Sequence, residues 1–146
     1  MVKEVTNHQI LVFVGRQGCY KTTWLARLLP PELQRYFCVR SNSGRLTKDD
    51  NLALSEFALI CLEEIDELRL GDINQLKAMV TLPAVNERRA YGHYKENRPH
   101  IASFCGTTNQ PEFLNDPTGS RRWLPFTVVH IDDPYTHPVD YAGVYG

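Results

Sequence analysis

The stretch "GRQGCYKTT", residues 15–23, is the part of the sequence that comes closest to a known chemical motif. It follows the phosphate-binding pattern G-x-x-x-x-G-K-[ST], in which backbone N–H groups surround a polyphosphate, the lysine reaches its terminal phosphates and the hydroxyl is a ligand of Mg²⁺. The motif therefore predicts ATP and Mg²⁺ as cofactors, with Lys21 and Thr22 in these two roles. The residues expected to surround the nucleotide are Gly15, Gly18, Cys19, Tyr20, Lys21, Thr22 and Thr23.

Tyr20 departs from this pattern, because it stands where the motif has glycine. A tyrosine with positive φ would be strained by roughly 1–2 kcal/mol. A tyrosine with helical angles would leave the loop competent, with its ring projecting outwards. We expect the helical backbone at Tyr20, with Gly18 supplying the conformational freedom of the loop.

A pair of acidic residues follows the apolar segment "ALICL". A strand that delivers two adjacent carboxylates to its carboxyl end suits a Mg²⁺-nucleotide site. Glu63 would serve the metal, and Glu64 would orient and deprotonate an attacking water. Asp66 and Glu67 are a second possible register for the same pair.

The segment "IASFCGTTN" ends on a third group of polar residues. Asn109 at its tip is suited to hydrogen-bond the attacking water or the γ-phosphate. In an open parallel sheet, ligands collect at the carboxyl ends of the strands. The three segments therefore predict one pocket.

An α/β domain with a parallel sheet flanked by helices is needed to bring these segments together. Apolar runs predict its strands, and apolar residues at helical spacing predict its helices. A basic and aromatic segment with Gly92 and Asn97 as turn candidates predicts a β-hairpin. The expected strands are Ile10–Val14, Phe57–Leu62, Ile101–Cys105 and Phe126–Ile131, with a short apolar piece at Tyr36–Val39, the helices are Lys21–Leu29, Lys48–Ser55 and Asp72–Leu82, and the hairpin lies within Ala84–His100.

Length and composition favour one domain, because 146 residues suffice for a single core. Sixteen Lys and Arg residues against 17 Asp and Glu exclude a global positive field, so a nucleic-acid surface would be a local patch. Four cysteines without a C-x-x-C pair favour a reduced interior.

We expect a cytoplasmic protein without membrane contact, since no apolar run approaches about 18 residues. The abrupt ending suggests a fragment of a longer protein, truncated near its C-terminus.

Several segments together resemble the virulence-associated protein E family of phages and bacterial mobile elements. They are "GRQGCYKTTWLARLLPPEL", "LICLEEIDEL", "RRAYGHY" and "GTTNQPEFLNDPTGSRRWLPF", and the resemblance runs from about Ile10 to Val128. It implies a P-loop ATPase of AAA+/helicase-like fold, akin to superfamily III helicases, with a β-hairpin insertion before the sensor strand. It also implies a homo-oligomeric ring, a hexamer, in the full-length parent, often with a primase domain in the same polypeptide.

The resemblance assigns roles to further residues. It places Asn109 at the sensor position, and Arg121 and Arg122 on the paired arginines after "TG". In ring ATPases such an arginine often reaches a neighbour's γ-phosphate and accelerates hydrolysis. A phosphate clamp in the same chain, or an ordinary solvated pair, are the alternatives.

Related helicases use the hairpin to contact single-stranded DNA. Cations that follow the phosphates and rings that stack on bases are the ingredients of such a contact. Glu87 and Glu96 dilute the charge, so a solvated hairpin is the alternative, and His93 stands where the family often has arginine. The residues expected to bind DNA are Arg88, Arg89, Tyr91 and Lys95, beside His93, Tyr94 and Arg98.

Taken together, the three motifs predict an ATP-hydrolysing domain, and the resemblance implies that it is the motor domain of a helicase or primase-helicase replication protein. A non-hydrolysing module that binds nucleotide or DNA, with its loop disabled by Tyr20, is the alternative. A small-molecule kinase is disfavoured, because nothing after the acidic pair resembles an acceptor-binding lid.

Overall fold

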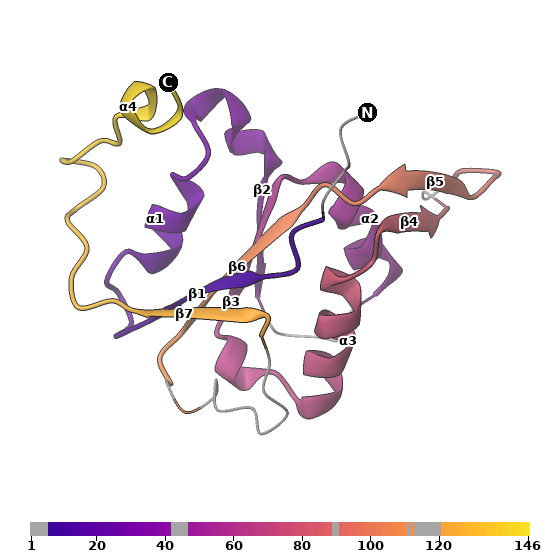
Figure 1. Cartoon of the computed structure of the whole chain (residues 1–146), viewed down its shortest axis with the longest axis horizontal. Helices are drawn as coiled ribbons and strands as arrows, with labels where there is room; N and C mark the ends of the chain where they lie inside the picture. Colours follow the sequence, from indigo (N-terminus) through magenta and orange to yellow (C-terminus); the bar gives the residue numbers. More distant parts are fainter. Residues whose placement is uncertain (1–5, 42–46, 89–90, 111, 113–120) are drawn as a thin grey trace.

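A five-stranded parallel sheet forms the centre of the computed structural model (Figure 1). The structure describes residues 6–41, 47–88, 91–110, 112 and 121–146. The strand order is β2-β3-β6-β1-β7, and each neighbouring pair is parallel. The strands are β1 (Ile10–Val14), β2 (Phe37–Ser41), β3 (Leu59–Glu63), β6 (Ser103–Thr108) and β7 (Trp123–Thr127).

Helices cover both faces of this sheet, which explains why its inner strands are almost continuously apolar. Alternate residues of β1 point to opposite faces. Ile10, Val12 and Val14 join a core with α2 (Lys48–Glu56) and α3 (Leu70–Val80). Phe13 joins a second core with Leu25 of α1 (Lys21–Ala26). The sheet therefore separates two cores, as the predicted α/β architecture requires.

The predicted α/β fold class is confirmed, although several elements begin or end at other residues than predicted. The last predicted strand, Phe126–Ile131, is wrong in position, because β7 lies at Trp123–Thr127. Its register is set by β1, since Trp123 is the partner of Ile10. β6 begins two residues later than predicted and continues to Thr108. α1 ends at Ala26, and the next turn tightens through bonds from Leu28 and Leu29 to carbonyls three residues back.

Beyond β7 the chain returns to the end of α1. The 3₁₀ helix η1 (Pro31–Tyr36) follows α1, and the short helix α4 (Tyr141–Tyr145) lies beside that end of the molecule (Figure 1). The Tyr141 hydroxyl donates to the Arg27 carbonyl at 2.9 Å, and the Tyr145 hydroxyl donates to the Leu28 carbonyl. These bonds satisfy carbonyls that the end of a helix leaves without partners.

A β-hairpin projects from the body of the protein, just before β6 (Figure 1). It consists of β4 (Ala84–Glu87) and β5 (Glu96–Pro99), which pair antiparallel. The predicted hairpin is therefore confirmed. Asn97 is not a turn residue, because it lies in β5 opposite Asn86. Tyr91, with φ of 65°, adopts a left-handed turn conformation instead.

All four cysteines are free thiols. Cys61 and Cys105 are register partners on β3 and β6, and both are buried. The hydrogen bond with Cys61 is the main cause that raises the pKa of the Cys105 thiol, and burial raises this pKa further. The thiol therefore stays protonated. In the described parts of the chain, no helix has the length and apolar character needed to cross a bilayer.

Candidate functional site: a phosphate loop and its pocket

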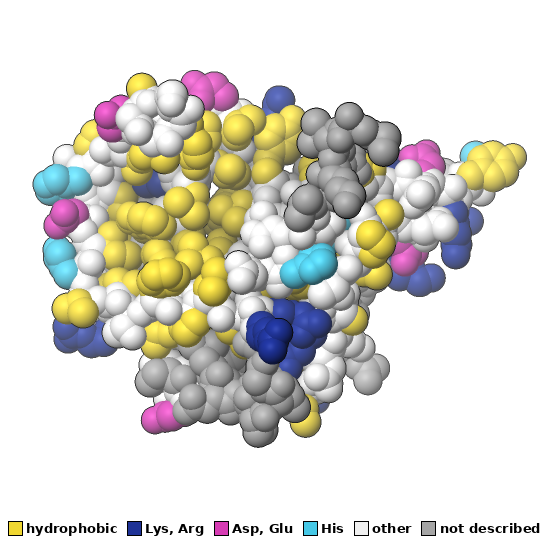
Figure 2. Space-filling model, viewed as in Figure 1, with side chains coloured by type: hydrophobic (Ala, Val, Ile, Leu, Met, Phe, Trp, Pro, Cys, Tyr) yellow, Lys and Arg dark blue, Asp and Glu magenta, His cyan; other side chains and the backbone are white. Residues whose placement is uncertain are grey.

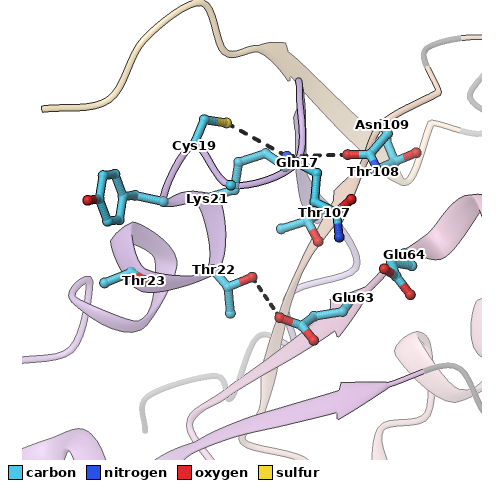
Figure 3. Close-up of a pocket in the computed structure, with 12 residues that line it drawn as sticks. Gln17, Cys19, Lys21, Thr22, Thr23, Glu63, Glu64, Thr107, Thr108 and Asn109 are labelled. Atoms are coloured by element: carbon cyan, nitrogen blue, oxygen red, sulfur yellow. Dashed lines mark hydrogen bonds between the residues drawn. The ribbon is translucent and has the colours of Figure 1, made fainter. Parts of the chain in front are cut away.

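The three predicted motifs meet at the carboxyl edge of the sheet. The loop after β1, the acidic residues after β3 and the tip of β6 surround a pocket of about 410 Å³ (Figure 3). Because β3, β6 and β1 are adjacent and parallel, their ends lie at one edge. The pocket is lined by Gln17, Gly18, Cys19, Tyr20, Lys21, Thr22, Thr23, Glu63, Glu64, Thr107, Thr108 and Asn109.

Lys21 lies at the centre of the loop. Its side chain is among the most buried charged groups described, at 7% exposure. The Nζ atom donates to the Gly15 carbonyl at 2.8 Å and to the Arg16 carbonyl at 2.6 Å, and it approaches Asn109 Oδ1 at 3.5 Å. Figure 3 shows the ammonium between the loop and Asn109. A buried cation held by neutral carbonyls is well placed to receive an anion.

Thr22 and Glu63, the two predicted metal ligands, face each other across the pocket (Figure 3). Thr22 Oγ1 donates to Glu63 Oε1 at 2.8 Å. Among the described residues no group of three or more His, Cys, Asp or Glu side chains could hold a metal. Mg²⁺ commonly takes one or two protein oxygens and completes its shell with water and phosphate oxygens, so this pair fits Mg²⁺ bound with a nucleotide.

Glu64 leads the chain out of β3. Its φ of 52° is left-handed, and this turn starts the 3₁₀ helix η2 (Ile65–Glu67). Glu63 and Glu64 both line the pocket. In the alternative register, Asp66 accepts a hydrogen bond from Thr108, and Glu67 is exposed outside the lining residues. The geometry therefore favours Glu63 and Glu64 as the acidic pair.

Our expectation of a helical backbone at Tyr20 is wrong. Tyr20 has φ of 59° and ψ of 18°, in the left-handed region, as does Gly18 with φ of 78°. The chain turns from loop to helix within this one residue, and the Tyr20 carbonyl already accepts the first helical bond from the Trp24 N–H at 2.8 Å. A non-glycine residue in this conformation costs about 1–2 kcal/mol. The loop therefore keeps the shape for which its motif uses glycine, at the expense of stability.

Replacing Tyr20 by glycine and by alanine tests this conformation. Both variants remove the ring, which is 40% exposed, so their difference reports on the backbone. We expect Tyr20→Gly to have a free energy of unfolding about 1 kcal/mol higher than Tyr20→Ala, because only alanine is strained at positive φ. Urea unfolding followed by circular dichroism measures this difference. Equal stabilities would show that position 20 is not left-handed in solution.

Gly15, the first residue of the loop, is required by packing. A Cβ atom there would lie 2.8 Å from the Val128 carbonyl oxygen. The Val128 N–H also donates to the Val14 carbonyl at 2.7 Å, so the chain leaving β7 is held against the start of the loop. A second cavity, of about 330 Å³, lies between loop residues 16–20 and residues 128–131.

Arg121 and Arg122 precede β7, at the opposite edge of the sheet from the pocket. The Arg122 carbonyl accepts from the Ile10 N–H at 2.6 Å, at the start of β1. The five residues of β7 separate this edge from the loop by roughly 16 Å. This distance argues against a contact between either arginine and a phosphate bound by Lys21 of the same chain.

Of the residues expected to bind DNA, Arg88, Tyr91 and Lys95 lie on the projecting hairpin. Arg88 and Lys95 are exposed, and Tyr91 and Tyr94 are 102% and 83% exposed. Figure 2 shows hydrophobic and basic side chains together at this projecting end. Arg89 lies outside the described residues. Arg98 is engaged by Glu96 at 2.5 Å and Glu56 at 3.8 Å, so its charge is already compensated.

Gln17 is a lining residue that the sequence did not point to. It occupies a variable position of the loop motif, and its type carries no signal of its own.

Comparison with known proteins identifies the family. The model of the virulence-associated protein E-like domain matches residues 5–142, nearly the whole chain. The chain belongs to this family. The resemblance expected from the sequence motifs is thereby confirmed. No curated protein sequence matches this virulence-associated protein E-like domain significantly.

Solved structures with the same fold include apo forms of the NrS-1 C-terminal region. One has a TM-score of 0.65 at 15% identity and covers 86% of this chain, and another has a TM-score of 0.60 at 14% identity and covers 84%. A mutant of Thermotoga maritima RuvB has a TM-score of 0.55 at 20% identity and covers 82%. The domain spans 31%, 28% and 38% of these chains, respectively. At such low identity the likeness is one of fold.

Proposed function

We propose that this domain binds and hydrolyses ATP as the motor of a helicase or primase-helicase replication protein of a phage or mobile element. The observation that carries the proposal is the position of Lys21. Its buried ammonium lies in a pocket that is also lined by Thr22 of the same helix and by two glutamates and an asparagine from neighbouring strand ends. Family membership and the P-loop fold support a replication-related NTPase-like module.

The pocket residues divide the chemistry among them. Lys21 and the loop N–H groups bind the terminal phosphates. Thr22 and Glu63 hold Mg²⁺, which neutralises charge on the phosphate oxygens when bound. Glu64 orients a water molecule and accepts its proton as the water attacks the γ-phosphate. Asn109, beside Lys21, hydrogen-bonds this water or the γ-phosphate.

Arg121 and Arg122 act on the pocket of a neighbouring subunit in this proposal. Their place at the far edge of the sheet supports a role between subunits, because they are remote from the pocket of their own chain. The full-length parent would then be a homo-oligomeric ring, a hexamer, with a primase domain as a possible neighbour. An arginine supplied in this way accelerates phosphoryl transfer by about 10³- to 10⁵-fold in other enzymes.

The hairpin is the proposed contact with single-stranded DNA, through Arg88, Arg89, Tyr91 and Lys95. Its exposed tyrosines offer faces for stacking, and its cations can follow the phosphates. The exposed rings of Tyr91 and Tyr94 support a DNA contact more strongly than the positive charges of the hairpin do. Glu87 and Glu96, which face each other in the stem, offset those positive charges.

ATP turnover and DNA binding by the domain and by its full-length parent test the proposal. We expect Mg²⁺-dependent hydrolysis that single-stranded DNA stimulates. The double variant Tyr91→Ala/Tyr94→Ala should weaken DNA binding by at least about 30-fold, because two stacked rings at on the order of 1–3 kcal/mol each contribute at least about 2 kcal/mol together. Fluorescence anisotropy with a labelled oligonucleotide measures this loss.

Tyr135→Ala is the matched control, since Tyr135 is also an exposed tyrosine but lies over Arg27, far from the hairpin in sequence. Its DNA affinity should equal that of the wild type. An unchanged affinity of the double hairpin variant would contradict the DNA contact. No ATP turnover by the parent, with or without DNA, would contradict the motor.

A second candidate function is a module that binds nucleotide or DNA without hydrolysis. The left-handed Tyr20 favours it, because strain in the loop lowers the stability of the binding geometry. The two candidates differ in one result: a wild-type parent that binds ATP and Mg²⁺ but releases no phosphate supports the second.

A further inference from the structure

A hydrogen-bond chain links the acidic loop to the tip of β6. Thr108 Oγ1 donates to Asp66 Oδ1 at 2.7 Å, and the same oxygen accepts from the Gln110 N–H at 3.0 Å. Thr108 is 1% exposed, and its carbonyl accepts from the Gly15 N–H at 3.1 Å. One buried threonine therefore contacts η2, the residue after Asn109 and the phosphate loop.

Packing of the neighbouring residue Ile65 holds the Asp66 carboxylate in place. Ile65 is fully buried and packs against Gly106 of β6. A Cβ at Gly106 would lie 3.1 Å from the Leu62 carbonyl oxygen of β3 and 3.4 Å from Ile65 Cγ2, so the glycine lets β6 lie close to β3 and in van der Waals contact with the start of η2. The Asp66 carboxylate can thus fix the orientation of the Thr108 hydroxyl, because it is itself held in place.

Asn109 lies between Thr108 and Gln110, the two residues that this series of hydrogen bonds holds in place. The bond from the Gln110 N–H to Thr108 Oγ1 closes a short turn around it. Among the described residues, its own side chain has one weak partner, Lys21 Nζ at 3.5 Å. The backbone turn, rather than packing, therefore sets the direction of the Asn109 amide.

We propose that Asp66 is a positioning residue, which acts through Thr108 to aim Asn109 at the terminal phosphate, so that the pocket distinguishes ATP from ADP. This inference rests on the proposed nucleotide site. It gives Asp66 a role different from the metal or water residue of the alternative acidic register. In this proposal Asp66 itself contacts neither nucleotide nor metal: its Oδ1 accepts from Thr108, and Asp66 is not among the residues that line the pocket.

Calorimetric titration with ADP and with a non-hydrolysable ATP analogue, both with Mg²⁺, tests the proposal. In Asp66→Ala and in Thr108→Val, we expect affinity for the ATP analogue to fall about five- to tenfold, the equivalent of one hydrogen bond. Affinity for ADP should change by less than about twofold, because ADP lacks the phosphate that Asn109 contacts. The double variant should lose no more than either single variant, since both break the same bond.

Conservative variants separate positioning from folding. Asp66→Asn keeps an acceptor and Thr108→Ser keeps the donor, so both should retain the preference for the ATP analogue. Glu67→Ala, on the same short helix but exposed, is the control and should bind both nucleotides as the wild type does. Thermal unfolding checks that each variant is folded. If the buried Thr108→Val variant does not fold, the Asp66→Ala variant still tests the proposal.

The outcomes are distinct. Equal losses for ADP and the ATP analogue would overturn the proposal in favour of a merely structural bond. An unchanged preference in Asp66→Ala, or a wild type that binds both nucleotides equally, would also overturn it while leaving the nucleotide site intact. A wild type that binds neither nucleotide would overturn the proposed function and this inference with it.

Discussion

Lys21→Met weakens ATP binding by about 10- to 100-fold, as the loss of charge-assisted hydrogen bonds worth about 1.5–3 kcal/mol predicts. Methionine keeps the aliphatic stem in its buried position but removes the ammonium that faces the pocket. Titration calorimetry with ATP and Mg²⁺ measures the change. We expect hydrolysis to be lost as well, because the terminal phosphates lose their cation.

Lys48→Met is the matched control, since Lys48 is exposed at the start of α2, away from the pocket. It should bind ATP as the wild type does. Lys21→Met also leaves the Gly15 and Arg16 carbonyls without their donor, so its stability should be compared by urea unfolding. A folded Lys21→Met variant with wild-type affinity would contradict the phosphate site.

We expect Glu64→Gln to lower the turnover number by about 10²- to 10⁴-fold, the usual contribution of a general base, if Glu64 has the role proposed above. Glutamine keeps the size and the hydrogen-bonding oxygen of the side chain but does not accept a proton from water. ATP affinity should stay within about twofold, because Glu64 has no part in holding the phosphates. Phosphate release in the presence of single-stranded DNA gives the turnover number, and calorimetry gives the affinity.

Glu67→Gln is the control for this experiment and also tests the other acidic register. Glu67 is exposed on η2 and is not among the residues that line the pocket. Its turnover should equal that of the wild type. A loss of turnover in Glu67→Gln with normal turnover in Glu64→Gln would transfer the role of base to the second register.

The meeting of the three motifs was predictable from the sequence for a simple physical reason. Buried parallel strands are recognisable as apolar runs, and their carboxyl ends share one edge of the sheet. Once "ILVFV", "LICL" and "SFC" are identified as strands, the positions of Lys21, Glu63 and Asn109 follow. The hairpin was predictable as well, because its strands are close in sequence.

The remaining features depend on contacts that no short pattern encodes. The left-handed Tyr20 results from the path between loop and helix, which a motif with glycine at that position does not describe for tyrosine. The position at which β7 begins is determined by its pairing with Ile10, which lies more than a hundred residues earlier in the sequence. The bond between Asp66 and Thr108 joins side chains 42 residues apart, each of which is unremarkable in its own segment.

The tyrosine bonds at the end of α1 bear on how this domain can be prepared. Lys21 is the first residue of α1, and the turn that follows the helix presents its carbonyls to Tyr141 and Tyr145. An expression boundary placed before residue 141 would remove both hydroxyls and leave the Arg27 and Leu28 carbonyls without these donors. The helix that begins with Lys21 would then lose these hydrogen bonds at its opposite end. Proteins made for nucleotide-binding measurements should therefore retain residues 141–146.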